Sequence, residues 1–299
     1  MPPARYRGRF APSPTGPLHF GSLVAALGSW LIARRNNGDW LLRIEDIDPP
    51  REIAGAALQQ IETLAAFGMQ SDEPVLWQST RSDAYADALN KLIDAGHAFT
   101  CRCSRSDLAT EAGIHRLCIA NDATRERTDR LPAIRLRVRD GRIGFDDAIQ
   151  GRYEQIAERD IGDVVLRRAD GLWAYQLAVV VDDAAQGITE VVRGADLLDS
   201  TPRQILLQRA LGLSTPAYAH LPLVVDKDGR KFAKSSAALP IDAAGALPAL
   251  RTAYAFLGQD AAAIADARTP DALLRRALDA FQPARVPKQM EARVLREDR

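Results

Sequence analysis

Residues 9–22 read RFAPSPTGPLHFGS, a turn rich in proline and glycine that joins a predicted strand at 5–11 to a predicted helix at 19–35 and overlaps the ends of both. In open parallel sheets, ligands bind outside the carboxyl ends of the strands, where a new helix directs free N–H groups at a phosphate. His19 can donate hydrogen bonds to phosphate oxygens, and Gly21 lets a nucleotide approach the backbone closely. The stretch therefore predicts a nucleotide site, with a plain strand-to-helix turn as the alternative.

Outward from this turn, strands and helices alternate along the chain. Apolar runs predict strands, and apolar residues at helical spacing predict helices. The further predicted strands lie at 40–44, 163–166, 189–193 and 218–225, and the further helices at 54–67, 82–95, 174–185 and 200–211. Such alternation is typical of an α/β fold with a parallel sheet, so we expect a Rossmann-like nucleotide-binding core.

Residues 99–163 interrupt this alternation and are expected to form an inserted, partly β subdomain, as the alternating segment IRLRV at 134–138 indicates. We therefore expect a catalytic core that is split between residues 1–98 and 164–240, with the insertion at 99–163. After residue 238 the chain is rich in alanine and has helical spacing, which predicts a C-terminal helical segment at 241–299.

The insertion contains all three cysteines and one of the four histidines of the chain: Cys101, Cys103, His115 and Cys118. Three thiolates and one imidazole complete the tetrahedral coordination of Zn²⁺ and leave no open position, so the cluster predicts a structural rather than a catalytic zinc site. The alternative is three unrelated buried thiols. The odd number of cysteines argues against a disulfide scaffold.

A second charged stretch follows the predicted strand at 218–225, where residues 226–236 read DKDGRKFAKSS. Gly229 provides flexibility, and Lys231 and Lys234 carry point charges that could stabilise a leaving pyrophosphate when the loop closes over a triphosphate. Most charged runs are instead solvated turns, so this stretch alone leaves both interpretations open.

Together the two stretches resemble the signatures of class I aminoacyl-tRNA synthetases. HFGS at 19–22 is similar to the HIGH signature of that family, and KFAKS at 231–235 is similar to its KMSKS signature, although Phe232 and Ala233 depart from it. The string at 9–16 and LRIEDID at 42–48 resemble the glutamyl and glutaminyl branch. The resemblance covers residues 1 to about 240 and implies an ATP-dependent enzyme that activates glutamate.

The resemblance also implies site residues. It implies ATP contacts at Pro12, His19, Gly21, Ser22, Lys231, Lys234 and Ser235, with His19 and Lys234 as catalytic residues and Mg²⁺ bound with the nucleotide. It implies glutamate contacts at Arg9, Ala11, Ser13, Glu45, Tyr175 and Arg193, with Glu45 at the ammonium group. From the residues alone, Glu45 could be an acidic strand end, Tyr175 a core residue and Arg193 part of a structural ion pair. In the zinc cluster, His115 departs from the family, where the third ligand is often tyrosine.

Only 64 residues follow Ser235, too few for the anticodon-binding region of a glutamyl-tRNA synthetase. Within the family, the chain therefore resembles the branch that keeps the catalytic core, activates glutamate without tRNA and loads it onto queuosine, the modified wobble nucleoside of tRNA(Asp). Three other hypotheses stay open: a truncated glutamyl-tRNA synthetase that charges the 3′ end of tRNA(Glu), a non-catalytic RNA-binding paralogue, and a nucleotidylyltransferase with the same architecture.

Composition limits the cellular location and the classes of partner that we expect. The chain of 299 residues has 39 basic and 39 acidic side chains, and this zero net charge argues against non-specific DNA binding. It has no apolar run of the ~20 residues that a membrane span needs, and its N-terminus does not resemble a signal peptide. We expect a cytoplasmic protein with no membrane and no DNA partner. The resemblance implies ATP, L-glutamate and tRNA(Asp) carrying queuosine as its partners.

Overall fold

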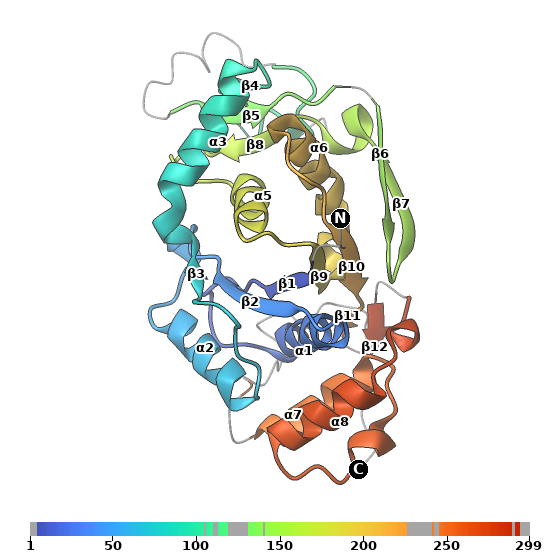
Figure 1. Cartoon of the computed structure of the whole chain (residues 1–299). Helices are drawn as coiled ribbons and strands as arrows, with labels where there is room; N and C mark the ends of the chain where they lie inside the picture. Colours follow the sequence, from blue (N-terminus) through green and yellow to red (C-terminus); the bar gives the residue numbers. More distant parts are fainter. Residues whose placement is uncertain are drawn as a thin grey trace.

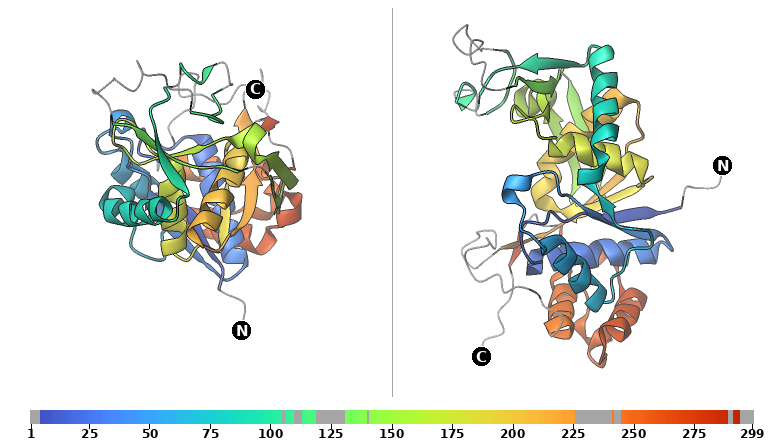
Figure 2. Two further views of the ribbon diagram at one scale, coloured as in Figure 1. Left: turned by 90° about the horizontal axis from the view of Figure 1, so that it is seen from above. Right: turned by 90° about the vertical axis from the view of Figure 1, so that its left-hand side faces the viewer.

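The computed structural model describes residues 5–104, 106–109, 113–118, 131–139, 141–225, 241, 245–288 and 291–293. Figure 1 shows a central sheet with helices on both sides. The insertion lies at one end of the molecule and the C-terminal helices at the other (Figure 2). The expected α/β fold class, with an insertion and a C-terminal helical segment, is confirmed.

The core is a parallel sheet in two joined halves. Strands β1 (Arg7–Phe10), β2 (Asp39–Ile44) and β3 (Leu76–Trp77) pair in parallel in that order, and β9 (Glu190–Gly194) pairs in parallel with β10 (Ala217–Leu221). Thr189, directly before β9, donates its backbone N–H to the carbonyl oxygen of Arg7 at 3.0 Å and joins the halves. The order β3-β2-β1-β9-β10 changes direction between β1 and β9, which is where such a sheet forms its ligand crevice.

The residues of β2 explain why helices cover both faces. Leu42 packs in the hydrophobic cluster of α1 (Phe20–Arg35), whereas its neighbour Leu41 packs in the cluster on the opposite face. That second cluster includes residues of α3 (Ser82–Asp94), α5 (Tyr175–Ala185) and α6 (Thr201–Leu211). Successive strand residues point to opposite faces, so a strand that is apolar at nearly every position is buried on both sides. Helix α2 (Ala56–Ala66) lies beside α1 (Figure 1).

Helix α1 begins at the turn of residues 9–22. His19 is its N-cap, and the imidazole Nδ1 accepts the backbone N–H of Ser22 at 3.2 Å, which satisfies one free N–H group of the first turn. Leu27 lies fully buried on the helix, and Arg34 and Arg35 in the last turn complement the helix dipole. The N-cap at His19 therefore fixes the end of the turn to the start of helix α1.

The insertion consists of antiparallel strands. β4 (Ala98–Cys101), β5 (Ala133–Leu136) and β8 (Val164–Arg167) form one antiparallel sheet, and β6 (Arg142–Asp147) forms a hairpin with β7 (Gly151–Ile156). The sequence predicted that residues 163–166 resume the parallel core, and this is wrong, because β8 pairs with β5. An apolar run identifies a strand but does not identify its partner, which here lies about thirty residues earlier.

Strand pairing also crosses the predicted domain limits. β4 begins at Ala98, and the end of β6 pairs in parallel with core strand β10 through Asp147 and Tyr218. The division into a split core at 1–98 and 164–240, an insertion at 99–163 and a segment at 241–299 therefore stays a prediction.

The strand predicted at 218–225 is interrupted at Pro222. Proline has no N–H to donate to a ladder, and it separates β10 from β11 (Leu223–Val225). β11 pairs in parallel with β12 (Glu291–Arg293), a strand near the end of the chain. The C-terminal segment is thus mainly helical, but one strand of it pairs with β11.

The C-terminal helices α7 (Ala246–Phe256) and α8 (Pro270–Ala280) pack below α1 (Figure 1). Phe256 contacts Phe20 edge to face, with the ring centroids 6.1 Å apart. Short helical turns complete the described chain at Pro49–Arg51, Gln78–Arg81, Ala157–Ile161, Ala195–Ser200, Ala261–Ile264 and Pro283–Arg285. No helix among the described residues has the length and hydrophobicity that crossing a membrane requires.

Candidate active site

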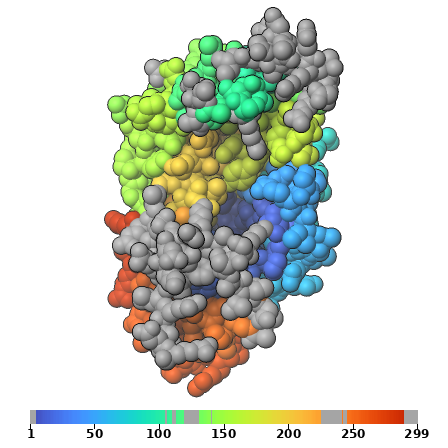
Figure 3. All heavy atoms as spheres, turned by 180° about the vertical axis from the view of Figure 1, so that it is seen from behind, coloured from blue at the N-terminus to red at the C-terminus, as the bar shows by residue number. Residues whose placement is uncertain are grey.

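A cavity of about 620 Å³ lies at the carboxyl ends of β1, β2, β9 and β10. Its walls contain the turn that follows β1, Glu45 after β2, Arg193 and Gly194 at the end of β9, and Pro222 after β10. Figure 3 shows this face of the molecule, where the dark-blue N-terminal residues lie in a hollow between later segments. The cavity therefore occupies the crevice that the strand order defines.

The turn of residues 9–22 forms one wall of this cavity. The residues expected to contact ATP from this turn all line it: Pro12, His19, Gly21 and Ser22. The His19 Nδ1 accepts a backbone N–H, so the neutral ring carries its proton on Nε2 as a donor. Gln60 of α2, which is buried, donates to the carbonyl oxygens of Ser13 at 3.1 Å and Gly16 at 2.7 Å. Sequence reasoning did not identify this brace of the turn.

The second motif, with Lys231, Lys234 and Ser235, lies outside the described residues. Described residues on either side of it lie beside the first motif. Val224 lines the cavity, and Ile241 donates its backbone N–H to the carbonyl oxygen of Leu18 at 3.1 Å. Both flanks of the second motif therefore lie beside the turn of residues 9–22.

Four charged side chains form a buried cluster beside the cavity, which Arg9 and Glu45 line: Arg9, Arg43, Glu45 and Asp183. Asp183 of α5 accepts hydrogen bonds from Arg9 Nε at 3.0 Å and Arg9 Nη2 at 3.2 Å, and from Arg43 Nη1 at 2.7 Å. Arg43 Nη2 lies 3.5 Å from Glu45 Oε1. Arg43 and Asp183 were missed from the sequence. A possible signal was a single arginine within the apolar run of residues 40–44.

The two carboxyl groups of this cluster differ in their electrostatic environment. Burial disfavours the ionised form of Asp183, but the guanidinium groups of Arg9 and Arg43 outweigh it and hold the pKa of this carboxyl below its ordinary value. Burial raises the pKa of Glu45, although Arg43 and Arg9 act in the opposite direction. Asp183 is thus fully paired, whereas Glu45 would gain from a further cation in the cavity.

Tyr175 and Arg193 also line the cavity. Arg193 Nη1 donates to the Tyr175 hydroxyl at 3.5 Å, Nη2 to the Thr201 hydroxyl at 2.8 Å, and Nε to His220 Nε2 at 3.1 Å. Arg193 is only 6% exposed, and no carboxylate of the described chain pairs with it directly. The structural ion pair considered from the sequence is therefore not seen there. A buried cation with neutral partners at a cavity wall favours an anionic ligand.

All six residues expected to contact glutamate line the same cavity: Arg9, Ala11, Ser13, Glu45, Tyr175 and Arg193. They come from four separate parts of the chain: the end of β1 and the turn that follows it, the position after β2, the start of α5 and the end of β9. The fold brings them together, and their roles toward a ligand stay predictions.

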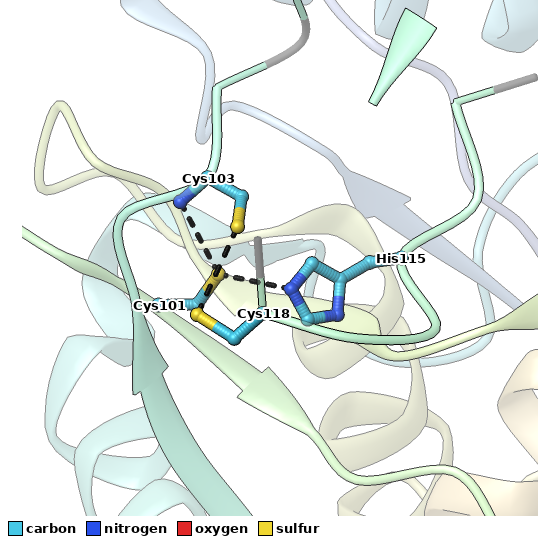
Figure 4. Close-up of side chains that lie close together, drawn as sticks. All are labelled: Cys101, Cys103, His115 and Cys118. Carbon is cyan, nitrogen blue, oxygen red and sulfur yellow. Dashed lines mark hydrogen bonds between the residues drawn. The ribbon is translucent and has the colours of Figure 1, made fainter. Parts of the chain in front are cut away.

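The Cys/His cluster lies in the insertion, away from this cavity. The ligand atoms of Cys101, Cys103, His115 and Cys118 all lie within 4.8 Å of one another, with 3.2 Å between Cys101 Sγ and His115 Nε2 (Figure 4). Tetrahedral thiolate ligands about 2.3 Å from a zinc ion lie roughly 3.8 Å apart. The Cys103 and Cys118 sulfurs are 3.8 Å apart, so the four side chains fit a metal ion of this kind.

Asp163 contacts the ring nitrogen of His115 that faces away from the three sulfurs. Its Oδ2 lies 2.8 Å from His115 Nδ1, while its Oδ1 accepts the backbone N–H of Val138 at 2.8 Å. Histidine ligands of metals commonly donate their other ring N–H to a carboxylate, which fixes the tautomer and the ring orientation. The arrangement therefore turns Nε2 of His115 toward the three sulfurs. The sequence did not indicate this partner.

Comparison with known proteins defines the class. The family of class I tRNA synthetases (E and Q), catalytic domain, matches residues 5–246, and the chain belongs to this family. It is therefore an ATP-dependent ligase, which excludes the nucleotidylyltransferase hypothesis.

Individual relatives are more specific. The chain is 58% identical to the glutamyl-Q tRNA(Asp) synthetase of Xanthomonas oryzae pv. oryzae over 292 residues, which cover 97% of this chain and 96% of that protein. It is 49% identical to the glutamyl-Q tRNA(Asp) synthetase of Pseudomonas entomophila over 291 residues, 97% of each chain. Among solved structures, it resembles a glutamate tRNA ligase from Elizabethkingia meningosepticum in complex with its amino acid, with a TM-score of 0.76 and 27% identity. That match covers 97% of this chain and 67% of the other.

Proposed function

We propose that this chain activates L-glutamate with ATP in the absence of tRNA, and then transfers the glutamyl group to queuosine at the wobble position of tRNA(Asp). The observation that carries the first half is the pair of opposite, buried charges on one cavity: the Glu45 carboxylate and the Arg193 guanidinium. Glutamate carries an ammonium group and two carboxylates, so it complements both charges. The names of the relatives support the second half.

In the proposed binding mode, Glu45 holds the ammonium group of glutamate and Arg193 holds a carboxylate. Arg9 uses Nε and Nη2 on Asp183, which leaves Nη1 for a ligand carboxylate. Ala11 and Ser13 contribute the turn that follows β1, and the Tyr175 hydroxyl lies beside the Arg193 guanidinium. The alternative, a truncated glutamyl-tRNA synthetase, would bind and activate glutamate in the same cavity. It would differ only in its RNA acceptor.

In the first chemical step, an oxygen of the glutamate α-carboxylate attacks the α-phosphorus of ATP. The bond from that phosphorus to the bridging oxygen breaks, and its electron pair leaves with pyrophosphate. Positioning and charge stabilisation carry such a reaction. His19 donates from Nε2 to the reacting phosphates, and Lys234 balances the charge of the leaving group. Pro12, Gly21, Ser22, Lys231 and Ser235 complete the proposed nucleotide contacts, and Mg²⁺ accompanies the triphosphate as part of the substrate.

In the second step, a hydroxyl of the cyclopentenediol of queuosine attacks the carbonyl carbon of glutamyl-adenylate. The bond from this carbon to the phosphate oxygen breaks, AMP leaves, and the hydroxyl proton is lost. A second cavity of about 520 Å³ shares Ser13, Glu45 and Tyr175 with the first, and Arg135 and Asp163 of the insertion also line it. This space between core and insertion supports an acceptor nucleoside beside the activated carboxyl group.

Transfer of labelled glutamate to RNA tests the proposed acceptor. We expect label on tRNA(Asp) that contains queuosine and none on tRNA(Asp) from cells that cannot make queuosine. Periodate oxidation of the RNA beforehand should abolish transfer, and fragment mapping should place the label in the anticodon loop. Label at the 3′ end of tRNA(Glu) would favour the truncated glutamyl-tRNA synthetase instead. Binding of RNA with no transfer to any tRNA would contradict the proposed acceptor.

We also propose that Cys101, Cys103, His115 and Cys118 hold one structural Zn²⁺. The metal would fix the loops between β4 and β8, since four side chains from one short stretch converge on it. Cys103→Ser should reduce the zinc content of the purified protein from about one per chain to well below that, because a hydroxyl is a poor replacement for a thiolate ligand. Elemental analysis after dialysis against a chelator measures this loss.

Two further variants sharpen the zinc prediction. Asp163→Asn should keep the metal but release it to a competing chelator about 10–100-fold more readily. Ser106→Ala, in the same loop but outside the ligand set, should behave as wild type. Full zinc retention in Cys103→Ser would contradict the proposed ligand set.

A further inference from the structure

Three buried polar side chains from three strands form a hydrogen-bonded series that ends at the cavity: Asp147 at the end of β6, His220 in β10 and Arg193 in β9. Asp147 Oδ2 lies 2.5 Å from His220 Nδ1, and Arg193 Nε lies 3.1 Å from His220 Nε2. Neither Asp147 nor His220 was among the site residues expected from the sequence. Both are as inaccessible as core residues, so neither touches a ligand itself.

The hydrogen bonds define the protonation of His220. A guanidinium N–H can only donate, so His220 Nε2 must accept from Arg193, and the ring proton must lie on Nδ1 and point at Asp147. Burial lowers the pKa of His220 and so favours the neutral ring. Burial opposes ionisation of Asp147, but hydrogen bonds from the imidazole and from backbone N–H groups outweigh it and hold the pKa of the carboxyl below its ordinary value. An ionised Asp147 therefore selects the tautomer that accepts from Arg193.

The backbone fixes the carboxylate in turn. Asp147 Oδ1 accepts the backbone N–H groups of Ile149 at 3.0 Å, Gln150 at 2.8 Å and His220 at 3.1 Å. Gln150 also donates its side-chain amide to the carbonyl oxygen of His220 at 2.7 Å. The turn between β6 and β7 thus binds both the backbone carbonyl of His220, through Gln150, and its imidazole, through Asp147. These hydrogen bonds hold the Asp147 carboxylate in place, so it does not pair with Arg193 directly.

We infer that Asp147 and His220 are positioning residues that orient the Arg193 guanidinium toward the substrate carboxylate. The inference rests on the proposed function, in which Arg193 binds a carboxylate of glutamate. A carboxylate in direct contact with Arg193 would orient the guanidinium but cancel its charge. The neutral imidazole between them transmits the orientation while the cationic charge stays available to the ligand. The pair therefore also serves the selection of glutamate over glutamine, whose side chain has no negative charge.

Asp147→Asn is the most selective variant for testing this inference. Its Oδ1 can keep the three backbone hydrogen bonds, while its amide nitrogen donates to His220 Nδ1 and moves the ring proton to Nε2, opposite the Arg193 N–H. In pyrophosphate exchange we expect the KM for glutamate to rise about tenfold or more, with a loss of glutamate preference over glutamine and little change in the KM for ATP. Glu154→Gln, an exposed change on the same hairpin, is the control.

A double-mutant cycle distinguishes orientation of Arg193 from a general structural role of Asp147 and His220. His220→Gln can still offer its carbonyl oxygen to Arg193 and has no tautomer to select, so it should restore much of the glutamate affinity that His220→Leu loses. In the His220→Gln background, Asp147→Asn should cost little further glutamate affinity. A purely structural role predicts instead equal losses toward glutamate and ATP, with no change in their ratio.

Nitrogen NMR of the histidine rings decides the inference independently of activity. The chain has only four histidines, so the ring signals can be assigned with single substitutions. We expect a neutral His220 protonated on Nδ1 in the wild type and on Nε2 in Asp147→Asn. An Nε2-protonated or doubly protonated ring in the wild type would overturn the inference, as would an unchanged KM for glutamate in Asp147→Asn. Absence of glutamate-dependent exchange in the wild type would instead count against the proposed function.

Discussion

Glu45→Gln should lower glutamate-dependent pyrophosphate exchange by about 100-fold or more, because the substrate ammonium group then enters a buried site without its anion. The amide has almost the same shape as the carboxylate, so the loss reports charge rather than packing. Most of the effect should appear as a higher KM for glutamate, with the KM for ATP nearly unchanged. Steady-state exchange at varied glutamate and ATP concentrations measures both values.

The neighbouring Asp46 offers a matched control for this prediction. Its carboxylate accepts hydrogen bonds from the backbone N–H and hydroxyl of Ser79 and does not line the cavity. Asp46→Asn should therefore stay within about threefold of wild-type exchange. Equal losses in Asp46→Asn and Glu45→Gln would show that a general acidic strand end, and not a specific ammonium site, explains this stretch.

The pH dependence of the wild type adds a second check on Glu45. Burial raises the pKa of Glu45, with Arg43, Arg9 and Arg193 opposing it and Asp183 reinforcing it. The ionised form binds the ammonium group, so kcat/KM for glutamate should fall as pH decreases through a pKa above that of an ordinary glutamate. Glu45→Gln should lack this acidic limb. Identical acidic limbs in both proteins would assign the titration to another group.

Asp183→Ala should destabilise the protein by about 3–5 kcal/mol, because it leaves the buried guanidinium groups of Arg9 and Arg43 without their shared anion. Urea unfolding of the wild type and the variant measures the difference in the free energy of unfolding. The pKa of Asp183 is lowered in the folded state, so this contribution is present at neutral pH and is lost as pH falls through that pKa.

The exposed pair of Arg142 and Glu154 on the β6–β7 hairpin is the control for Asp183. Glu154→Gln should change the free energy of unfolding by about 0–1 kcal/mol, since surface ion pairs contribute little. If Asp183→Ala unfolds at the same urea concentration as Glu154→Gln, the buried charge cluster does not stabilise the fold in the way its geometry indicates.

The fold was largely predictable because local periodicity and the turn at 9–22 define a parallel α/β core. Two features were not predictable. β8 pairs with β5 rather than with the core, and β11 pairs with β12 near the end of the chain. Both depend on partners that are remote in sequence, whereas periodicity identifies only the element itself. Pro222 was visible in the sequence and could have divided the last predicted strand.

The candidate site was predictable only where a motif marked it. Residues 9–22 and the resemblance indicated the side chains that line the cavity, and cysteine spacing indicated the metal cluster. The partners that hold these side chains were not marked: Arg43 and Asp183 are 140 residues apart, and Asp147 and His220 are 73 residues apart. Such buried pairs exist only after the fold has formed, so no local pattern reports them.

The most direct measurement of the central claim is exchange of labelled pyrophosphate into ATP by purified protein treated to remove RNA. We predict exchange that depends on L-glutamate, is far weaker with glutamine or aspartate, and is not increased by adding tRNA. Exchange that requires tRNA, or that does not depend on glutamate, would contradict a cavity built from Glu45 and Arg193 to bind and activate this amino acid on its own.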